Sequence, residues 1–407
     1  MLENLKRWWA KRSTSSSTLW NPMPWLREAI GMEPTESGIP VSGDSALRCT
    51  AVLACVRVLS ESVAVLPLNL YRRSGDTTSL ADEHPLYDVL HRRPNDLQTS
   101  YEFRALLMVW LCLHGNAYAE IVRDGKGQVT ALWPCRPDRM LIRFEDGRLV
   151  YTYAQPGGDL FRLAPENVLH IRALSTGLAG ISPIAAAKQS IGLSLAAEKF
   201  GATYFGSGAR IGGVLEYPGT LNDESTRNIR DSFRRNYSGA DKFHELMILE
   251  EGMKWNPQTI RNDEAQWLET RRFGVEDIAR IFRVPPHMIG QLDNANYANV
   301  EAMDRAFISH GLTPWLTNME QAYSLKLLSP SEQATLYVEH DLTRTLRGDH
   351  DARMKGYQAG IYSGIYSPND CRRMENLNPR DGGDTYLQPT NMAPSPWSPT
   401  QGNLPKE

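Results

Sequence analysis

Three residues with metal-binding side chains, His84, Asp88 and His91, lie within the short stretch HPLYDVLH. Imidazole nitrogens and carboxylate oxygens are zinc ligands, and spacings of three and four residues place such groups on successive turns of a helix. The same stretch also has the pattern of an ordinary amphipathic helix, because Pro85 suits the first helical position and the leucine and valine residues after it share one face. We expect the structural helix, and keep a DNA-processing metalloenzyme that uses His84, Asp88 and His91 as the alternative hypothesis.

The other clusters of reactive side chains favour no catalytic site. Asp349, His350 and Asp351 are adjacent, so on a helix they point in different directions and do not converge on one ion. The glycines between residues 206 and 213 are not followed by Gly-Lys-Ser or Gly-Lys-Thr, so they do not form a phosphate-binding loop. No serine occupies a nucleophile-elbow sequence. We therefore expect no catalytic residue, no bound metal and no cofactor.

The segment from Phe273 to Tyr297, FGVEDIARIFRVPPHMIGQLDNANY, contains a helix that must stop at a double proline. Its apolar residues recur every three or four positions, and Pro285 with Pro286 ends the helix, so Arg283 or Val284 should be the last helical residue. The loop that follows is polar and nearly uncharged. Its candidate functional residues are Gln291, Asp293, Asn294, Asn296, Tyr297 and Asn299. Taken alone, a loop of this composition is typical of solvated surface.

Length and composition indicate a globular protein of two or three lobes, since the chain has 407 residues, 41% of them hydrophobic. A net charge of -3 argues against a dedicated nucleic-acid binder, which needs an excess of Lys and Arg, but allows transient contact with DNA. Five cysteines without a Cys-x-x-Cys pair predict neither a disulfide framework nor a zinc ribbon, and suit a reducing cytosol during synthesis. The apolar runs are too short for a membrane span, and the first residues lack the apolar core of a secretory signal.

The elements that must position these residues begin after a flexible N-terminal arm, residues 1–44, which is rich in Ser, Thr, Pro and Gly. Residues 45–180 combine helices over 46–65 and after Ser100 with a strand at 68–72 and a series of short strands up to 173, separated by Gly-containing turns. This mixture predicts an α+β lobe.

Residues 181–211 carry small side chains at many positions, so we expect a helix over 181–207 that packs closely against neighbours, including copies of itself in an oligomer. Residues 212–262 predict a small α/β insert, with strands at 214–216 and 245–249 and a helix capped by Asn222 or Asp223. A helix over 263–285 then returns, so the two helices flanking the insert can run antiparallel.

The C-terminal part is mainly helical. A helix over 300–328 should kink at Pro314, and the chain up to residue 346 should return as a strand. Residues 347–378 predict helices with a break at 362–364, after which Ser367 is the N-cap, Pro368 the first helical residue and Asp370 the third. Residues 379–407 are Pro-rich, and we expect them to be disordered.

In the order of its predicted elements, the chain resembles the head portal proteins of long-tailed double-stranded DNA bacteriophages. Four segments carry the resemblance within residues 45–392: GISPIAAAKQSI, YFGSGARIGGVLEYPGTL, FGVEDIARIFRVPPHMIG and AGIYSGIYSPNDCRRMENLNPRDGGDTY. The resemblance implies an α+β portal fold assembled as a ring, usually a dodecamer, at one capsid vertex. Such a ring is the conduit through which a separate terminase motor packages DNA and from which DNA is later ejected, and it joins head to tail.

The resemblance also implies a role for each part of the chain. The parts are the wing 45–180, the stem helices 181–211 and 263–285, the clip 212–262, the tunnel loop 286–299, a second wing segment 300–346 and the crown 347–378. A tunnel loop with little positive charge suits moving DNA, because each added Lys or Arg strengthens phosphate binding.

The implied partners are further copies of the chain, the major capsid protein, the terminase large subunit, a head-completion adaptor protein and double-stranded DNA, with no membrane. The implied location is the virion, after synthesis in the host cytoplasm, and the implied role is not enzymatic.

Five basic residues form the candidate partner surface of the clip: Arg227, Arg230, Arg234, Arg235 and Lys242. They face either a motor or head-completion protein or simply water, and the sequence leaves both readings open. A head-tail connector without a DNA channel remains the second alternative to the portal hypothesis.

Overall fold

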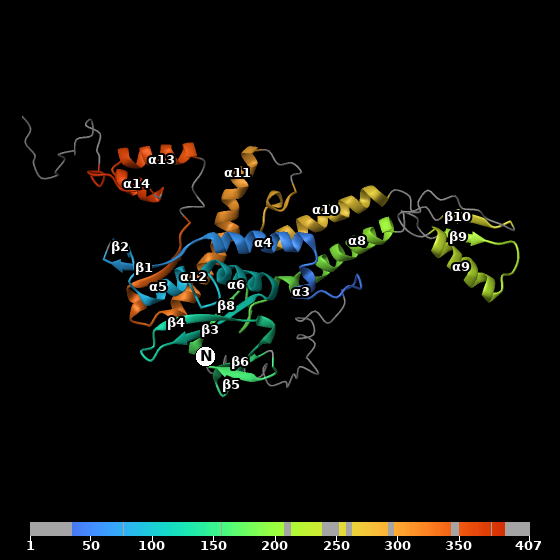
Figure 1. Ribbon diagram of the computed structural model, residues 1–407, viewed down its shortest axis with the longest axis horizontal. Helices are drawn as coiled ribbons and strands as arrows, with labels where there is room; N and C mark the ends of the chain where they lie inside the picture. Colours follow the sequence, from blue (N-terminus) through green and yellow to red (C-terminus); the bar gives the residue numbers. More distant parts are fainter. Residues whose placement is uncertain are drawn as a thin grey trace, which may run out of the picture. The chain divides into compact units, whose positions relative to one another are not determined.

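The computed structural model describes residues 35–75, 77–155, 157–206, 213–237, 252–257, 263–291, 297–342, 350–375 and 377–386 (Figure 1). The chain divides into two compact units, Met1–His340 and Asp341–Glu407. Helices and antiparallel strands alternate through the first unit, which confirms the predicted α+β class.

Two helices form the centre of the first unit. They are α4 (Thr50–Val65) and α6 (Ser100–His114), which pack against each other through buried apolar side chains. The start of α6 is fixed by a capping box between Thr99 and Glu102, and its end by Gly115, whose φ of 70° is the left-handed conformation that glycine adopts without strain. The shorter helices α3 (Gly43–Ala46) and α5 (Pro85–His91) pack beside them.

Three antiparallel sheets complete the predicted wing. The first has the order β11-β1-β2, with β1 (Leu68–Ser74) between β11 (Leu336–His340) and β2 (Thr77–Leu80). The second has the order β4-β3-β8, from β3 (Asn116–Arg123), β4 (Val129–Cys135) and β8 (Val168–Arg172). The third joins β5 (Met140–Glu145), β6 (Arg148–Ala154) and β7 (Leu160–Leu163).

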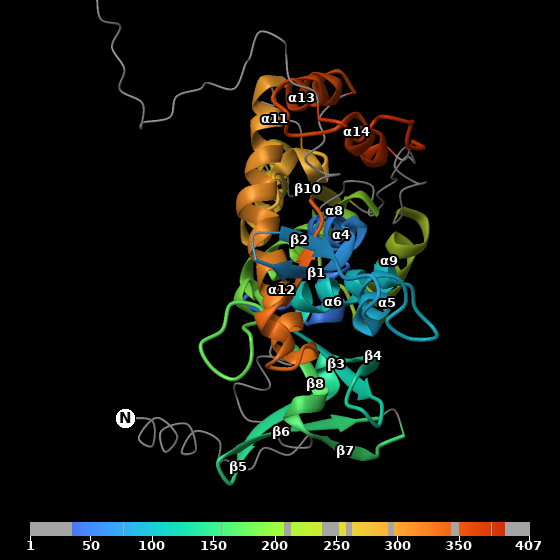
Figure 2. The same ribbon diagram turned by 90° about the vertical axis from the view of Figure 1, so that its left-hand side faces the viewer.

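The second and third sheets lie next to each other (Figure 2), and side chains from both contribute to one apolar core. Tyr118, Cys135 and Val168 from the second sheet pack with Tyr151 from the third. The short antiparallel pairs and the turn at Asp146 and Gly147 were predicted from the sequence, and both are confirmed.

Two long helices follow the sheets. Helix α8 (Lys188–Gly206) packs along α10 (Asp263–Phe282), and they approach so closely that a Cβ on Gly274 would lie 2.7 Å from Ser194 Oγ. Predicting one helix from residue 181 was wrong in detail, because a separate turn, α7 (Pro183–Ala186), comes first. The Ser182 hydroxyl holds that turn against α6 by donating to Leu113 O at 2.6 Å, whereas α8 packs along α10. In the described part of the chain, every helix is too short or too polar to cross a membrane.

The insert between these helices contains β9 (Gly213–Glu216), α9 (Asp223–Tyr237) and β10 (Lys254–Pro257). The predicted strand at 214–216 and the cap at Asn222 are confirmed, since Asn222 Oδ1 accepts from Ser225 N at 2.7 Å. The predicted strand at 245–249 lies outside the described residues. Strand β10, which pairs with β9, was not predicted, because four residues ending in proline carry little strand signal.

A long interrupted helix leads back to the first sheet. It consists of α11 (Tyr297–Ala306), a π-helical segment (Phe307–Leu312) and α12 (Thr313–Leu327). The prediction at Pro314 was a kink. The structure shows a π-helical segment just before that residue, in which the amide of Thr313 bonds to Ile308 O, five residues back. The helix begins at Tyr297 rather than at residue 300.

The second unit contains α13 (His350–Tyr362) and α14 (Pro368–Met374). Arg353 and Tyr357 from α13 both contact Glu375 Oε1, at 3.1 and 2.8 Å. The predicted break and the Ser367–Asp370 capping box are confirmed.

Candidate functional site

The contacts of His84, Asp88 and His91 contradict the hypothesis that these three residues bind one metal ion. His84 Nδ1 accepts from Leu86 N at 3.2 Å, which makes it the N-cap of α5, and its Nε2 lies 3.1 Å from Glu332 Oε1. Asp88 pairs with Arg92, and His91 stacks on Tyr87 with its Nδ1 3.3 Å from Leu68 O. The three side chains therefore point to different partners. In the ranges that the structure describes, no three His, Cys, Asp or Glu side chains form a metal-binding group.

The double proline is preceded by a Schellman motif that ends α10 one residue earlier than predicted. Arg283 adopts a left-handed φ of 55°, Val284 N bonds to Ala279 O at 3.0 Å, and Arg283 N bonds to Arg280 O at 3.2 Å. These two bonds satisfy carbonyls that a terminated helix would otherwise leave unpaired, and Val284 is buried beneath them. The predicted end at Arg283 or Val284 was wrong because the motif, rather than the proline, sets the last helical residue.

The candidate tunnel loop is shorter than predicted. A 3-10 turn (Pro286–Ile289) follows the prolines, and Gln291 comes just after Gly290, whose φ is 89°. Tyr297 and Asn299 belong to the first turn of α11, so assigning them to the loop was wrong: their polarity was taken as a loop signal although both residues are compatible with a helix. Asp293, Asn294 and Asn296 lie outside the described residues.

Side-chain contacts tie the segment that leads into this loop to both flanking helices. Before it, Gln291 Nε2 donates to Glu276 Oε1 on α10 at 3.1 Å. Across it, His287 Nε2 lies 2.8 Å from Asp304 Oδ1 on α11, with the His287 side chain only 10% exposed. Neither His287 nor Asp304 was predicted as a site residue, because no periodic pattern links a residue in a 3-10 turn to one on the next helix. The segment just before the loop is thus held to both flanking helices.

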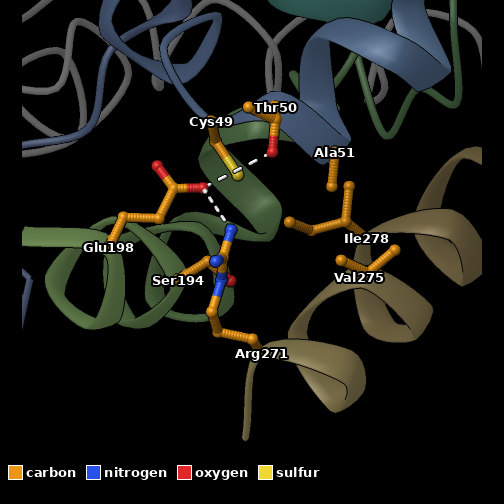
Figure 3. Close-up of a pocket in the computed structure, with 8 residues that line it drawn as sticks. All are labelled: Cys49, Thr50, Ala51, Ser194, Glu198, Arg271, Val275 and Ile278. Atoms are coloured by element: carbon orange, nitrogen blue, oxygen red, sulfur yellow. Dashed lines mark hydrogen bonds and ion pairs between the residues drawn. The ribbon is translucent and has the colours of Figure 1, made fainter. Parts of the chain in front are cut away.

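The long helices meet the start of α4 at a small polar junction (Figure 3). Glu198 on α8 accepts from Thr50 Oγ1 at 3.5 Å and lies 3.9 Å from Arg271 Nη2 on α10. Burial raises the pKa of the neighbouring Cys49 thiol, so this cysteine is neutral and unreactive. These groups line a cavity of about 20 Å³, large enough for one water molecule. A carboxylate at the amino end of α4 also interacts favourably with the helix dipole.

The two long helices also carry large apolar side chains in contact with solvent. Leu193 and Phe200 on α8 are 55% and 52% exposed, and they share one face because they are seven residues apart. Phe273 on α10 is 59% exposed. Such side chains on a pair of packed helices indicate a surface that another chain covers.

Part of the predicted clip surface can be placed. Arg227 and Arg230 are exposed and three residues apart on α9, so they lie on one face. Arg234 and Arg235 belong to the same helix, and Lys242 lies outside the described residues.

Comparison with known proteins identifies the family. The model of the family described as phage portal protein matches residues 50–376. The chain is 33% identical over 370 residues to the probable portal protein of Streptomyces phage phiC31, covering 88% of this chain and 81% of that protein. It is 29% identical over 360 residues to the portal protein of Enterobacteria phage HK97, covering 87% of this chain and 84% of that protein.

A solved structure resembles the chain in fold. The neck of an empty GTA particle contains a chain that is 26% identical, with a TM-score of 0.57, and the match covers 84% of this chain and 95% of that one. Since the family model matches most of the sequence and the named relatives align along most of their own lengths, the chain belongs to the phage portal protein family.

Proposed function

We propose that this chain is the portal subunit of a phage capsid, and that its copies form a ring that conducts double-stranded DNA through one vertex. The observation that carries the proposal is the exposure of three large apolar side chains on the packed helices α8 and α10, namely Leu193, Phe200 and Phe273. Burying one such side chain stabilises by roughly 1.5–3 kcal/mol, and a ring repeats that gain at every subunit boundary.

In this assembly α8 and α10 form the stem, the insert between them the clip, the α+β lobe the wing, and α13 with α14 the crown. The loop after Gln291 is the tunnel loop that faces the channel, and Asp293, Asn294 and Asn296 are its candidate DNA-facing residues. The ring itself is a structural conduit. A terminase motor packages the DNA, the major capsid protein holds the ring in the virion, and an adaptor protein completes the head at the clip.

The contacts that fix the loop support this assignment. The His287–Asp304 and Gln291–Glu276 contacts tie the segment just before the loop to α11 and α10. These contacts hold the start of the loop against the two helices that form the wall of the proposed ring. The exposed Arg227 and Arg230 of α9 suit an acidic surface on the motor or the adaptor.

Electron microscopy of the purified full-length protein tests ring formation. Closed rings with a central hole are expected, and a monomer under all solution conditions contradicts the proposal. The paired variant Leu193→Asp and Phe273→Asp should abolish rings while the circular dichroism spectrum stays native, because buried carboxylates at the subunit boundary are strongly unfavourable. Leu160→Asp is the matched control, since Leu160 is 67% exposed but lies on β7.

DNA contact is tested separately, which also distinguishes a portal from a head-tail connector without a channel. Replacing Asn294 and Asn296 by Ala should leave rings intact and impair DNA packaging or retention, whereas a simple surface loop would tolerate both changes. Asn296→Cys carrying a DNA-reactive crosslinker should react with packaged DNA, and Leu160→Cys with the same reagent should not. The five native cysteines are buried, so labelling is selective. Rings without crosslinks would favour the connector.

A further inference from the structure

Among the described residues, five buried side-chain polar atoms of the first unit have no hydrogen-bond partner, and three of them are Arg104 Nε, the Tyr323 hydroxyl and His340 Nε2. The residues of these three atoms are 5%, 0% and 3% exposed, so bulk solvent does not reach them. Buried polar groups in folded proteins are nearly always hydrogen-bonded to protein or to ordered water. The three atoms come from α6, α12 and β11, three elements far apart in the chain.

Arg104 and His340 lie in the same region of the first unit, because each contacts or pairs with a residue near the connection between α4 and β1. Arg104 Nη2 donates to Ala64 O at 2.8 Å, at the carboxyl end of α4. The chain then passes into β1, where Leu68 is the register partner of His340 on β11. The guanidinium of Arg104 and the residue His340 thus both lie next to the short connection between α4 and β1.

Tyr323 joins them from α12. Glu320 Oε1 accepts from the backbone N of His340 at 2.9 Å and lies 2.8 Å from its Nδ1. Tyr323 is three residues after Glu320 and shares its helix face, which is turned toward His340. Burial raises the pKa of the Tyr323 phenol and the Arg104 charge opposes that rise, while burial and, more weakly, the same charge lower the pKa of His340. The Arg104 charge therefore acts on both groups.

The protons in this region can be assigned from chemistry. The Glu320 carboxylate only accepts, so His340 Nδ1 carries a hydrogen, and in the neutral ring Nε2 is then an acceptor. Arg104 Nε is a donor, and the Tyr323 hydroxyl can both donate and accept. A bridging ligand must accept from Arg104 and donate to His340. Water does both, whereas an anion would face the lone pair of Nε2.

We propose that one bound water molecule bridges Arg104 Nε, the Tyr323 hydroxyl and His340 Nε2, and so joins α6, α12 and β11. Waters of this kind typically make about three hydrogen bonds to polar groups that otherwise lack partners. The guanidinium also donates to Leu90 O at 3.4 Å, at the end of α5. Arg104 thus contacts the ends of α4 and α5, and a single water would connect it to α12 and β11 as well.

A density map of the full-length protein, at a resolution that shows ordered water, tests the site directly. One peak within hydrogen-bonding distance of all three atoms is expected. Direct bonds among the three side chains, or a region without density between them, would overturn the proposal. A crystal soaked in bromide gives the remaining outcome, because an anomalous peak at the site would mean an anion rather than water.

Stability measurements test the shared ligand independently. Tyr323→Phe removes the hydroxyl, and His340→Asn keeps an amide donor for Glu320 while it removes the Nε2 acceptor. If both residues bind one water, the change in the unfolding equilibrium constant of the double variant should differ from the product of the two single changes by about threefold or more. Simple additivity contradicts the shared water. Tyr337→Phe on the same strand, β11, is the matched control and should change the constant little.

Discussion

Replacing Asn116 by Ala should lower the free energy of unfolding more than any ordinary polar truncation. Asn116 is 8% exposed and its amide joins segments far apart in the chain. Nδ2 donates to Gly180 O at 2.9 Å and to His114 O at 3.0 Å. Oδ1 accepts from Gly180 N at 2.7 Å and lies 3.0 Å from His170 Nε2. The side chain thus fastens β3 to the segment that leads into α7 and α8.

The backbone of Gly180 fixes the orientation of this amide. An N–H can only donate and a carbonyl can only accept, so Oδ1 faces Gly180 N and also accepts from His170 Nε2. His170 Nδ1 is then an acceptor for the Tyr151 hydroxyl at 3.2 Å. Burial lowers the pKa of His170 to about 3, with smaller contributions from the Arg172 and Lys326 charges, which agrees with this neutral ring.

The magnitude follows from what Asn116→Ala leaves unpaired. Gly180 N–H, Gly180 C=O and His170 Nε2–H would each lose a partner, and an unsatisfied buried group costs roughly 1–3 kcal/mol. Allowing for water that enters the space of the lost amide, we expect a loss of about 3–5 kcal/mol. This is a large share of the roughly 5–15 kcal/mol that stabilises a folded domain.

Urea denaturation followed by circular dichroism measures this loss as a shift of the midpoint. Asn318→Ala is the matched control, because Asn318 Nδ2 makes one partly exposed bond to Arg172 O at 2.6 Å and its loss should cost about 1 kcal/mol or less. If the two variants lose the same free energy of unfolding, Asn116 does not connect β3 to the segment before α7 in the way described above, and the reasoning is refuted.

Three further perturbations test other local features. The pKa of His170 in the folded protein is about 3, well below its ordinary value of 6.5, so the unfolded state binds the proton first and the free energy of unfolding should fall as the pH drops between these two values. His170→Gln should therefore flatten the dependence of the urea midpoint on pH. Gly115→Ala would place a Cβ 2.1 Å from Ile181 O at a left-handed φ, so a loss of at least about 2 kcal/mol is expected in thermal unfolding, and an unchanged melting temperature would contradict the close approach. Ser367→Ala removes the cap of α14 and should cost about 1 kcal/mol, with faster amide exchange over 368–374 as the local readout.

Features that depend on neighbouring residues were predictable from the sequence. The capping box of Ser367 and Asp370, the left-handed Gly115 and the cap at Asn222 all appear where their residue types favour them. Pro314 likewise disrupts the helical hydrogen bonds where it should, because a missing amide hydrogen acts within one turn. Each of these effects is contained in a few consecutive residues.

The candidate site was predicted less completely. The loop was found from its prolines and its polarity, but α11 begins at Tyr297, inside the predicted loop, because polar residues also fit the first turn of a helix. Helix α10 ends at Phe282 because Arg283 adopts a left-handed conformation, which is uncommon outside glycine and asparagine. Neither boundary has a strong signal in residue type.

The sequence by itself determined the α+β class, the order of the elements and membership of the portal family, since periodicity, turn residues and the ordered segments are all properties of the linear chain. Only the tertiary structure decided which polar side chains meet. His287 meets Asp304 across 17 residues, and Asn116 meets Gly180 across 64. A hydrogen bond requires two atoms within about 3 Å, and for residues so far apart in the chain that distance is set by the packing of helices and sheets rather than by any local pattern.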